Sequence, residues 1–184
     1  MLSKSQREHI KSLVRTMQII VLALAGSVVL FMVVVLVMQA GGQVAQQVPR
    51  EPLISYAAII FAFVSLALWV VVPRLIAGQM RLAIADGKPV NSSDGGAFVS
   101  EEMREIHPLI AMYQTTLILA CAILEGAAFF NVVAFLLERQ QMNFIAAGVL
   151  ALLIFSQVPT GGRLVSWVED ELGNIDRLRS MRRT

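Results

Sequence analysis

Four long apolar segments alternate with short charged ones, and they restrict the possible folds more than any other feature of the sequence. They cover residues 17–38, 53–72, 113–137 and 143–159. An α-helix rises about 1.5 Å per residue, so about 20 apolar residues cross a hydrocarbon core about 30 Å thick. The sequence therefore predicts an all-α polytopic membrane protein, a single membrane domain whose four transmembrane helices form two hairpins.

The composition agrees with this class. Of 184 residues, 57% are hydrophobic and only 15% are charged, which is typical of a polytopic membrane protein and leaves no room for a separate large soluble domain. The net charge is only +2 and the basic residues flank the apolar segments, so no nucleic-acid partner is expected. The single cysteine, Cys121, excludes an intrachain disulfide.

The basic residues predict how the chain is oriented in the membrane. Of the 15 Lys and Arg residues, only Arg50 and Arg139 lie between the first and second or the third and fourth apolar segments. Because Lys and Arg are enriched in cytoplasmic loops, both termini are predicted to lie in the cytoplasm. The predicted location is a cytoplasmic (inner) membrane of the bacterial type, with multiple crossings and the lipid bilayer as the main partner.

Two flanking segments have amphipathic patterns. Residues 5–16 predict a short helix along the membrane surface, and residues 160–181 predict a cytoplasmic helix that follows a kinked or early-ending fourth span. The apolar stripe of the second helix comprises Leu164, Val168, Leu172, Ile175 and Leu178. We expect this stripe to pack on the membrane surface or on the N-terminal helix, with a partner-binding coiled coil as the alternative.

A cytoplasmic loop is predicted over residues 74–108. Its first part continues an apolar face past Pro73, so the second helix can extend into it. A short helix beginning near Ser100 is expected before His107 and Pro108, and Pro108 suits the first turn of the third span.

Glu125 is the only carboxylate inside the third apolar segment and lies near its middle. A charged side chain at the bilayer centre costs about 2.5 to 3.5 kcal/mol on insertion scales, so such a residue is a functional-site hypothesis by default. Desolvation disfavours the charged form; Glu125 would therefore be neutral much of the time and could exchange a proton when its exposure changes.

The same residue has two further interpretations. Glu125 could have a structural role, in which a hydrogen bond to another residue fixes the helix register. Four partners are possible: Gln157, Ser65, Ser27 or Asn131. It could also contact a lipid or a small molecule. We give the structural interpretation the greatest weight.

Small and polar residues near Glu125 predict helix packing. Ala122 and Gly126 form a small-xxx-small pair, and Gly26 occupies a similar small-residue centre in the first span. Asn131 lies about 120° or more around the helix from Glu125, so it needs a different partner and is also expected to have a structural role. Such helices predict a homo-oligomer or a hetero-oligomer with other membrane proteins.

Residues 114–137 resemble the outer, proton-binding helix of subunit c, the proteolipid of rotary ATP synthases. The shared elements are a polar start, a small-residue stretch, one carboxylate and an apolar end, here Thr115-Thr116, Ala120 to Ala122, Glu125, and Val132-Val133-Ala134 with Leu136-Leu137. The resemblance implies that Glu125 is a proton-binding carboxylate. It implies nothing about the rest of the chain.

No catalytic or cofactor-binding motif is found. The sequence has no phosphate-binding glycine-rich loop, nucleophile elbow, zinc-protease signature or paired catalytic carboxylates, so no enzyme activity, cofactor or metal is predicted. His9 and His107 lack a cluster of further ligands and are expected to be surface residues. The predicted function is an accessory or structural component that associates through transmembrane helix packing. The alternative is a proteolipid-like subunit that binds or translocates protons through Glu125.

Overall fold

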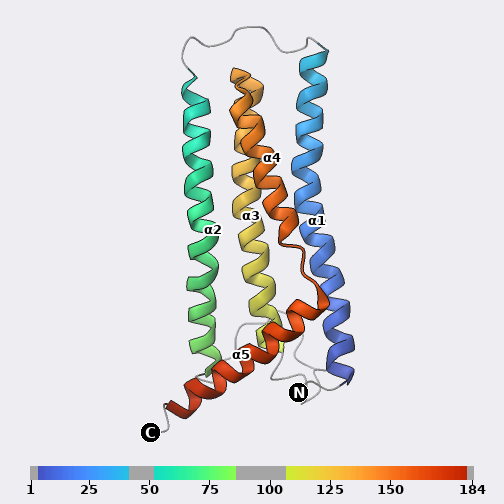
Figure 1. The fold of residues 1–184 in the computed structure, drawn as a ribbon, viewed down its shortest axis with the longest axis vertical. Helices are drawn as coiled ribbons and strands as arrows, with labels where there is room; N and C mark the ends of the chain where they lie inside the picture. The colour runs from blue at the N-terminus through green and yellow to red at the C-terminus, as the bar shows by residue number, and fades with distance from the viewer. Residues whose placement is uncertain (1–3, 42–51, 86–106, 182–184) are drawn as a thin grey trace. The chain divides into compact units, whose positions relative to one another are not determined.

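The computed structural model describes residues 4–41, 52–85 and 107–181, and nearly all of them are helical (Figure 1). The helices are α1 (Lys4–Ala40), α2 (Leu53–Ala85), α3 (His107–Glu138), α4 (Gln141–Ser156) and α5 (Gly161–Met181). The predicted all-α class is therefore confirmed.

Among the described residues, three helices contain a stretch that is long and apolar enough to cross a membrane. These stretches are Ile10–Ala40, Leu53–Leu82 and His107–Glu138. Helix α4 has 16 residues and is about 24 Å long, so alone it is shorter than a hydrocarbon core of about 30 Å. A short break after Ser156 separates it from α5, and the number of possible spans is four if α4 and α5 together count as one broken span. The expected early end of the fourth segment, followed by a separate helix, is confirmed.

The residues group into two compact units, and each unit contains parts of the long helices. Unit 1 contains residues 1–18, 73–117 and 159–184, and unit 2 contains residues 19–72 and 118–158. Unit 2 thus holds most of the apolar residues of α1 to α4, and unit 1 holds the remaining parts of α1, α2 and α3 together with α5.

In unit 2, α3 is the central helix and lies between α1 and α2 (Figure 1). Aromatic pairs join α3 to α1, α2 and α4, namely Phe129 with Phe31, Phe130 with Phe61, and Phe135 with Phe144, with ring centroids 4.9 to 5.6 Å apart. Small buried residues such as Ala127 and Ala128 let neighbours approach α3 from several sides. Helix α3 therefore contacts all three of the other helices of this unit.

The outer faces of α2 and α4 in unit 2 are apolar. Phe63 on α2 and Leu152 on α4 are each 68% exposed, and many of their neighbours are also large and exposed. Apolar surface of this extent is unusual on a soluble monomer, whereas in a bilayer it faces hydrocarbon. The structure therefore agrees with membrane association.

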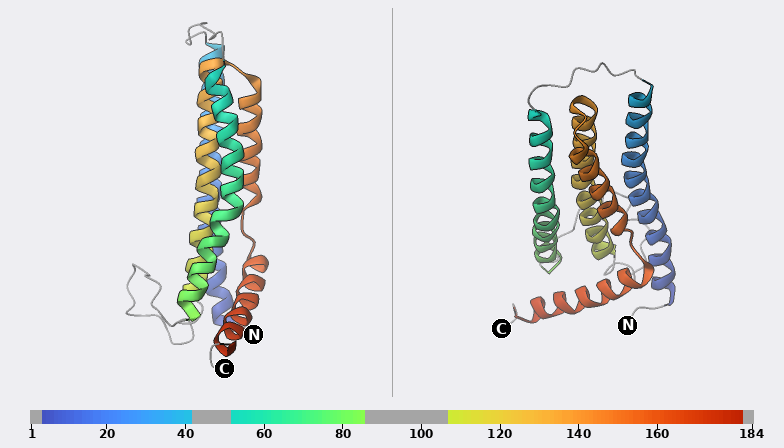
Figure 2. Two further views of the ribbon diagram at one scale, coloured as in Figure 1. Left: turned by 90° about the vertical axis from the view of Figure 1, so that its left-hand side faces the viewer. Right: turned by 45° about the horizontal axis from the view of Figure 1, so that its top comes forward.

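In unit 1, α5 contacts three helices in succession (Figure 2). Near its start, Gln18 Nε2 of α1 donates a hydrogen bond of 2.8 Å to the Pro159 carbonyl oxygen. Farther along, the Trp167 ring lies 5.1 Å from the Tyr113 ring of α3, and Glu171 then forms an ion pair with Arg81 of α2. Leu164 and Val168 of the predicted apolar stripe are fully buried, so part of the stripe packs within this chain; the side chains of Ile175 and Leu178 lie outside the described residues.

The N-terminal amphipathic segment is not a separate helix. Residues 5–16 belong to the continuous helix α1, because no Gly or Pro interrupts the chain before the first span. Ile10, Val14 and Met17, which follow one another at helical spacing in this part of α1, are buried, as expected for one face of an amphipathic helix.

The segment between α2 and α3 is shorter than the predicted loop, residues 74–108. Helix α2 passes through Pro73 and ends at Ala85, and α3 already begins at His107. Proline removes one backbone hydrogen bond but is tolerated in membrane helices, where neighbours and local adjustments compensate. Residues 86–106, including the short helix expected near Ser100, lie outside the described residues.

Candidate functional site

Glu125 lies half-buried on α3 in unit 2 and is paired with α1. Its Oε1 atom is 2.6 Å from the Oγ atom of Ser27. Ser27 is one of the four partners that the sequence leaves open, and it is the one found here. Asn131 instead contacts α2, so Glu125 and Asn131 face different helices.

Ser27 Oγ lies close to two oxygen atoms. Ser27 Oγ also lies 2.6 Å from the Leu24 carbonyl oxygen, at hydrogen-bonding distance. A hydroxyl has one proton to donate and can accept two hydrogen bonds. Ser27 thus has two acceptors within reach, the Leu24 carbonyl oxygen of its own helix and Glu125 Oε1 of α3, and the second contact links α1 to α3.

Asn131 joins α3 to α2. Its side chain is fully buried, and Nδ2 donates to the carbonyl oxygens of Ala58, at 3.2 Å, and of Ala127, at 2.8 Å. The Oδ1 atom of Asn131 is buried and has no hydrogen-bond partner among the described residues. Asn131 therefore contributes to helix packing at the cost of one unsatisfied acceptor.

The other three predicted packing residues lie at the surface of the described part of the chain. Ala122 and Gly126 on α3 and Gly26 on α1 are exposed, and a Cβ atom at either glycine would meet nothing within 4 Å. The physical reason is that α3 packs through other faces, which carry residues such as Leu124 and Ala128. A contact of these small residues with a second chain stays a prediction.

A buried polar cluster around Glu138 was not predicted. The Glu138 carboxylate accepts hydrogen bonds from the backbone N–H groups of Ile54, at 2.9 Å, and Ser55, at 2.8 Å, and Asn143 Nδ2 donates to Ser55 Oγ at 2.6 Å. The first N–H groups of a helix lack partners within the helix, and a carboxylate is favoured there. The cluster thus joins the start of α2, the end of α3 and the start of α4.

One sequence signal could have led to this cluster. Pro52 precedes α2 and offers no side-chain acceptor, and the first turn of α2 contains no acidic residue, so the cap has to come from elsewhere. Glu138 is the only acidic residue that ends an apolar segment. The pairing itself depends on which helices are neighbours, and this the sequence does not tell.

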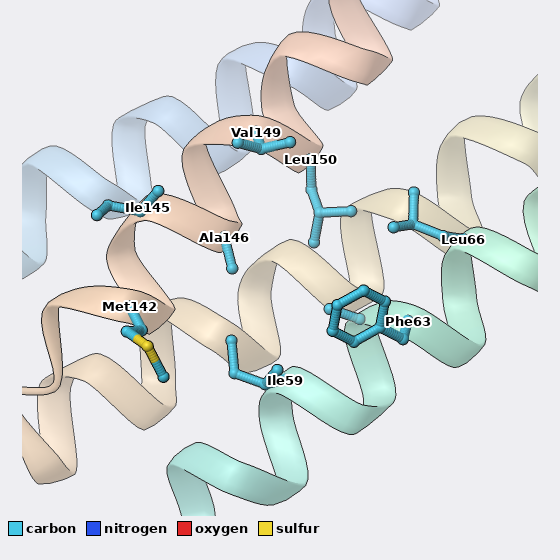
Figure 3. A pocket seen from close by; sticks show the side chains of 9 residues that line it. Ile59, Phe63, Leu66, Met142, Ile145, Ala146, Val149 and Leu150 are labelled. Carbon is cyan, nitrogen blue, oxygen red and sulfur yellow. The ribbon is translucent and has the colours of Figure 1, made fainter.

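A second unpredicted feature of unit 2 is an apolar groove between α2 and α4 (Figure 3). It has a volume of about 490 Å³ and is lined by four residues of α2 and five of α4, all of them apolar. None of the buried polar side chains described above lines it. The groove and the polar contacts are therefore separate features.

The described residues contain no group of three or more His, Cys, Asp or Glu side chains that could hold a metal ion. His107 is exposed, and the side chain of His9 lies outside the described residues. No protein-family model, no curated protein and no solved structure matches the chain. The resemblance of residues 114–137 to subunit c therefore rests on that segment alone.

Proposed function

We propose that this chain is an accessory or structural component of a bacterial-type cytoplasmic membrane, with both termini in the cytoplasm. Its intramembrane polar residues hold its own helices together, and its exposed faces associate with other membrane proteins. The observation that carries the proposal is that Glu125, Asn131 and Glu138 of α3 each bond to a neighbouring helix of the same chain.

The polar side chains are arranged differently from those of a transport pathway. Ionisable residues that move protons or ions line a water-filled cavity or form a chain across the membrane. In unit 2 the described residues instead pair locally, Glu125 with α1 and Asn131 with α2, while the groove has only apolar walls. This arrangement supports a structural role of these residues, as interhelical hydrogen bonds, over a role in translocating protons or ions.

The exposed small residues supply the associating surface. Ala122 and Gly126 leave one side of α3 open to close approach by another membrane helix. The partner is a second copy of this chain or another membrane protein.

A proton-binding role of Glu125 is the second candidate. It is favoured by one observation: Glu125 is a carboxyl in an apolar helix and is only half-buried, so it is accessible for proton exchange. In this alternative, the resemblance of residues 114–137 to subunit c reflects a shared chemistry.

Labelling with dicyclohexylcarbodiimide separates the two candidates. The purified protein in lipid is treated across a pH series and the modified peptides are identified by mass spectrometry, with Glu125→Gln as the control. A structural Glu125 predicts no pH-dependent labelling and little change in thermal stability for Glu125→Gln, because an amide still donates to Ser27. Selective labelling of Glu125 that fades as pH rises would contradict the structural role and support proton binding.

A further inference from the structure

We propose that the groove between α2 and α4 binds one acyl chain of a membrane lipid. Its volume of about 490 Å³ is within the range of about 300 to 1,000 Å³ found for small-ligand sites. Its walls contain no polar side chain, so a polar ligand would lose its hydrogen bonds to water without replacing them. A hydrocarbon chain makes no hydrogen bonds to water and therefore loses none in the groove.

The shape of the groove favours a flexible chain over another helix. The small residues Ala62 and Ala146 are among the lining residues of α2 and α4, whereas Phe63 and Ile145, which also line the groove, are 68% and 64% exposed. Figure 3 shows Phe63 and Ile145 on the two helices. Close helix packing in membranes uses small residues at the contact, and a helix with its side chains is about 10 Å or more across. A single acyl chain is much narrower than a helix and can lie between these side chains.

The position of the groove explains why lipid reaches it. Its α2 wall lies within the apolar stretch Leu53–Leu82, which is long enough to cross the membrane. At one end, the hydrogen bond between Asn143 and Ser55 lies about one helical turn before Ile59 of the groove lining. Lining residues such as Phe63 and Ile145 are exposed, so the acyl chains of the surrounding bilayer can reach the groove. No group in the groove can recognise a headgroup.

Native mass spectrometry of the full chain tests this site. The protein is extracted in mild detergent from vesicles of either phosphatidylcholine or phosphatidylglycerol, and retained lipid is counted. Ala146→Trp fills the groove, and Leu152→Trp, on the exposed face of α4 outside the groove, is the matched control. We expect one retained lipid per chain in the wild type and the control, from either vesicle, and about tenfold weaker retention in Ala146→Trp.

Three results would overturn the proposal. The first is equal retention in Ala146→Trp and the wild type, and the second is retention from only one of the two vesicles, which would indicate a headgroup site. The third is a wild-type dimer that Ala146→Trp dissociates, because the groove would then hold a second copy of the chain. Thermal midpoints of both variants are measured in parallel, and Ala62→Trp, from the opposite wall, repeats the test if Ala146→Trp fails to fold.

Discussion

Ser27 and Glu125 are a polar pair between two apolar helices, and the energy of such pairs is asymmetric. Hydrogen bonds between membrane helices average about 0.6 kcal/mol, whereas a buried polar group left without a partner costs about 1 to 3 kcal/mol. Removing one member of the pair is therefore worse than removing both. The contribution of Glu125 to stability thus depends on Ser27.

This asymmetry gives a prediction for Ser27→Ala. The variant leaves the Glu125 carboxyl without its α1 partner and should lower the free energy of unfolding by about 1 kcal/mol. The double variant Ser27→Ala with Glu125→Leu should be closer to the wild type than Ser27→Ala alone. Thermal unfolding in detergent measures both, and a double variant that loses the full sum of the two single losses would contradict the pairing.

Asn131 gives a second prediction at the same scale. Its Oδ1 atom has no partner, and its Nδ2 atom donates to carbonyl oxygens of two helices. Asn131→Leu, of similar size, should therefore change the free energy of unfolding by no more than about 1 kcal/mol.

Asn131→Asp is the matched contrast to Asn131→Leu. It places a carboxyl against the Ala58 and Ala127 carbonyl oxygens and should cost at least about 2 kcal/mol. The two variants are compared by thermal unfolding in the same detergent. A Leu variant that is less stable than the Asp variant would contradict this prediction.

At the scale of single helices, the ends of α2 are held by side chains of other helices. The first turn receives the Glu138 carboxylate of α3, and the far part is held by the ion pair of Arg81 with Glu171 of α5. Each contact lies within one unit, Glu138 in unit 2 and Glu171 in unit 1. Helix α2 is therefore stabilised by contacts that are distant in the sequence.

Loss of the Glu138 cap is predicted to loosen the start of α2. Glu138→Ala removes the acceptor for the N–H groups of Ile54 and Ser55 and should cost about 1 to 3 kcal/mol. Glu138→Gln keeps a carbonyl acceptor and should lose less. Hydrogen exchange should quicken at the first turn of α2 in the Ala variant and stay unchanged in α5, and equal acceleration in both regions would indicate general unfolding instead.

The ion pair in unit 1 predicts how firmly α5 is held. Glu171 is only 3% exposed at its side chain, and Arg81 reaches it through a second bond of 2.8 Å, so Arg81→Met leaves a buried carboxylate without its cation. Because Arg81 itself is partly exposed, the expected cost is about 1 to 3 kcal/mol, less than for a fully buried pair.

Limited proteolysis measures this effect. Arg81→Met should be cut faster within α5 than the wild type. Replacing both residues with Met should restore much of the resistance, because no charge is then left buried. If the double variant is cut as fast as Arg81→Met, the loss of stability in Arg81→Met comes from the lost attraction between the charges. The cost of a buried carboxylate without its cation would then not be the cause.

Local sequence patterns predicted the elements well and their contacts poorly. Apolar length identified the spans, and the stripe containing Leu164 and Val168 identified α5 and part of its buried face. The continuation of α2 through Pro73 was suggested by the apolar face beyond it, yet the predicted loop was too long.

The candidate site could be predicted only in part, because its contacts join helices that are distant in the sequence. Glu125 stands out because it is one carboxylate in an apolar run, and Ser27 was one of several equal partners. Glu138 and the groove depend on which helices are neighbours and how far apart they lie, and hydrophobic periodicity contains neither quantity.

At the scale of the whole molecule, the account depends on α4 crossing the membrane. Helices α1, α2 and α3 are long enough alone, whereas α4 is a crossing only if the bilayer adapts to its 16 residues or if residues after the break contribute. With four crossings, α5 lies on the same side of the membrane as the far part of α2, where Arg81 can reach Glu171. With three crossings the two helices would lie on opposite sides.

Cysteine accessibility tests this claim most directly. Cys121→Ser gives a background without thiols, and single cysteines then replace three exposed residues, Gln79 on α2, Gln140 between α3 and α4, and Ser180 on α5. In intact bacterial cells, a membrane-impermeant maleimide should label the cysteine at 140, and those at 79 and 180 only after permeabilisation. Labelling of 140 and 180 together in intact cells would show that α4 does not cross, and would contradict the four-span account.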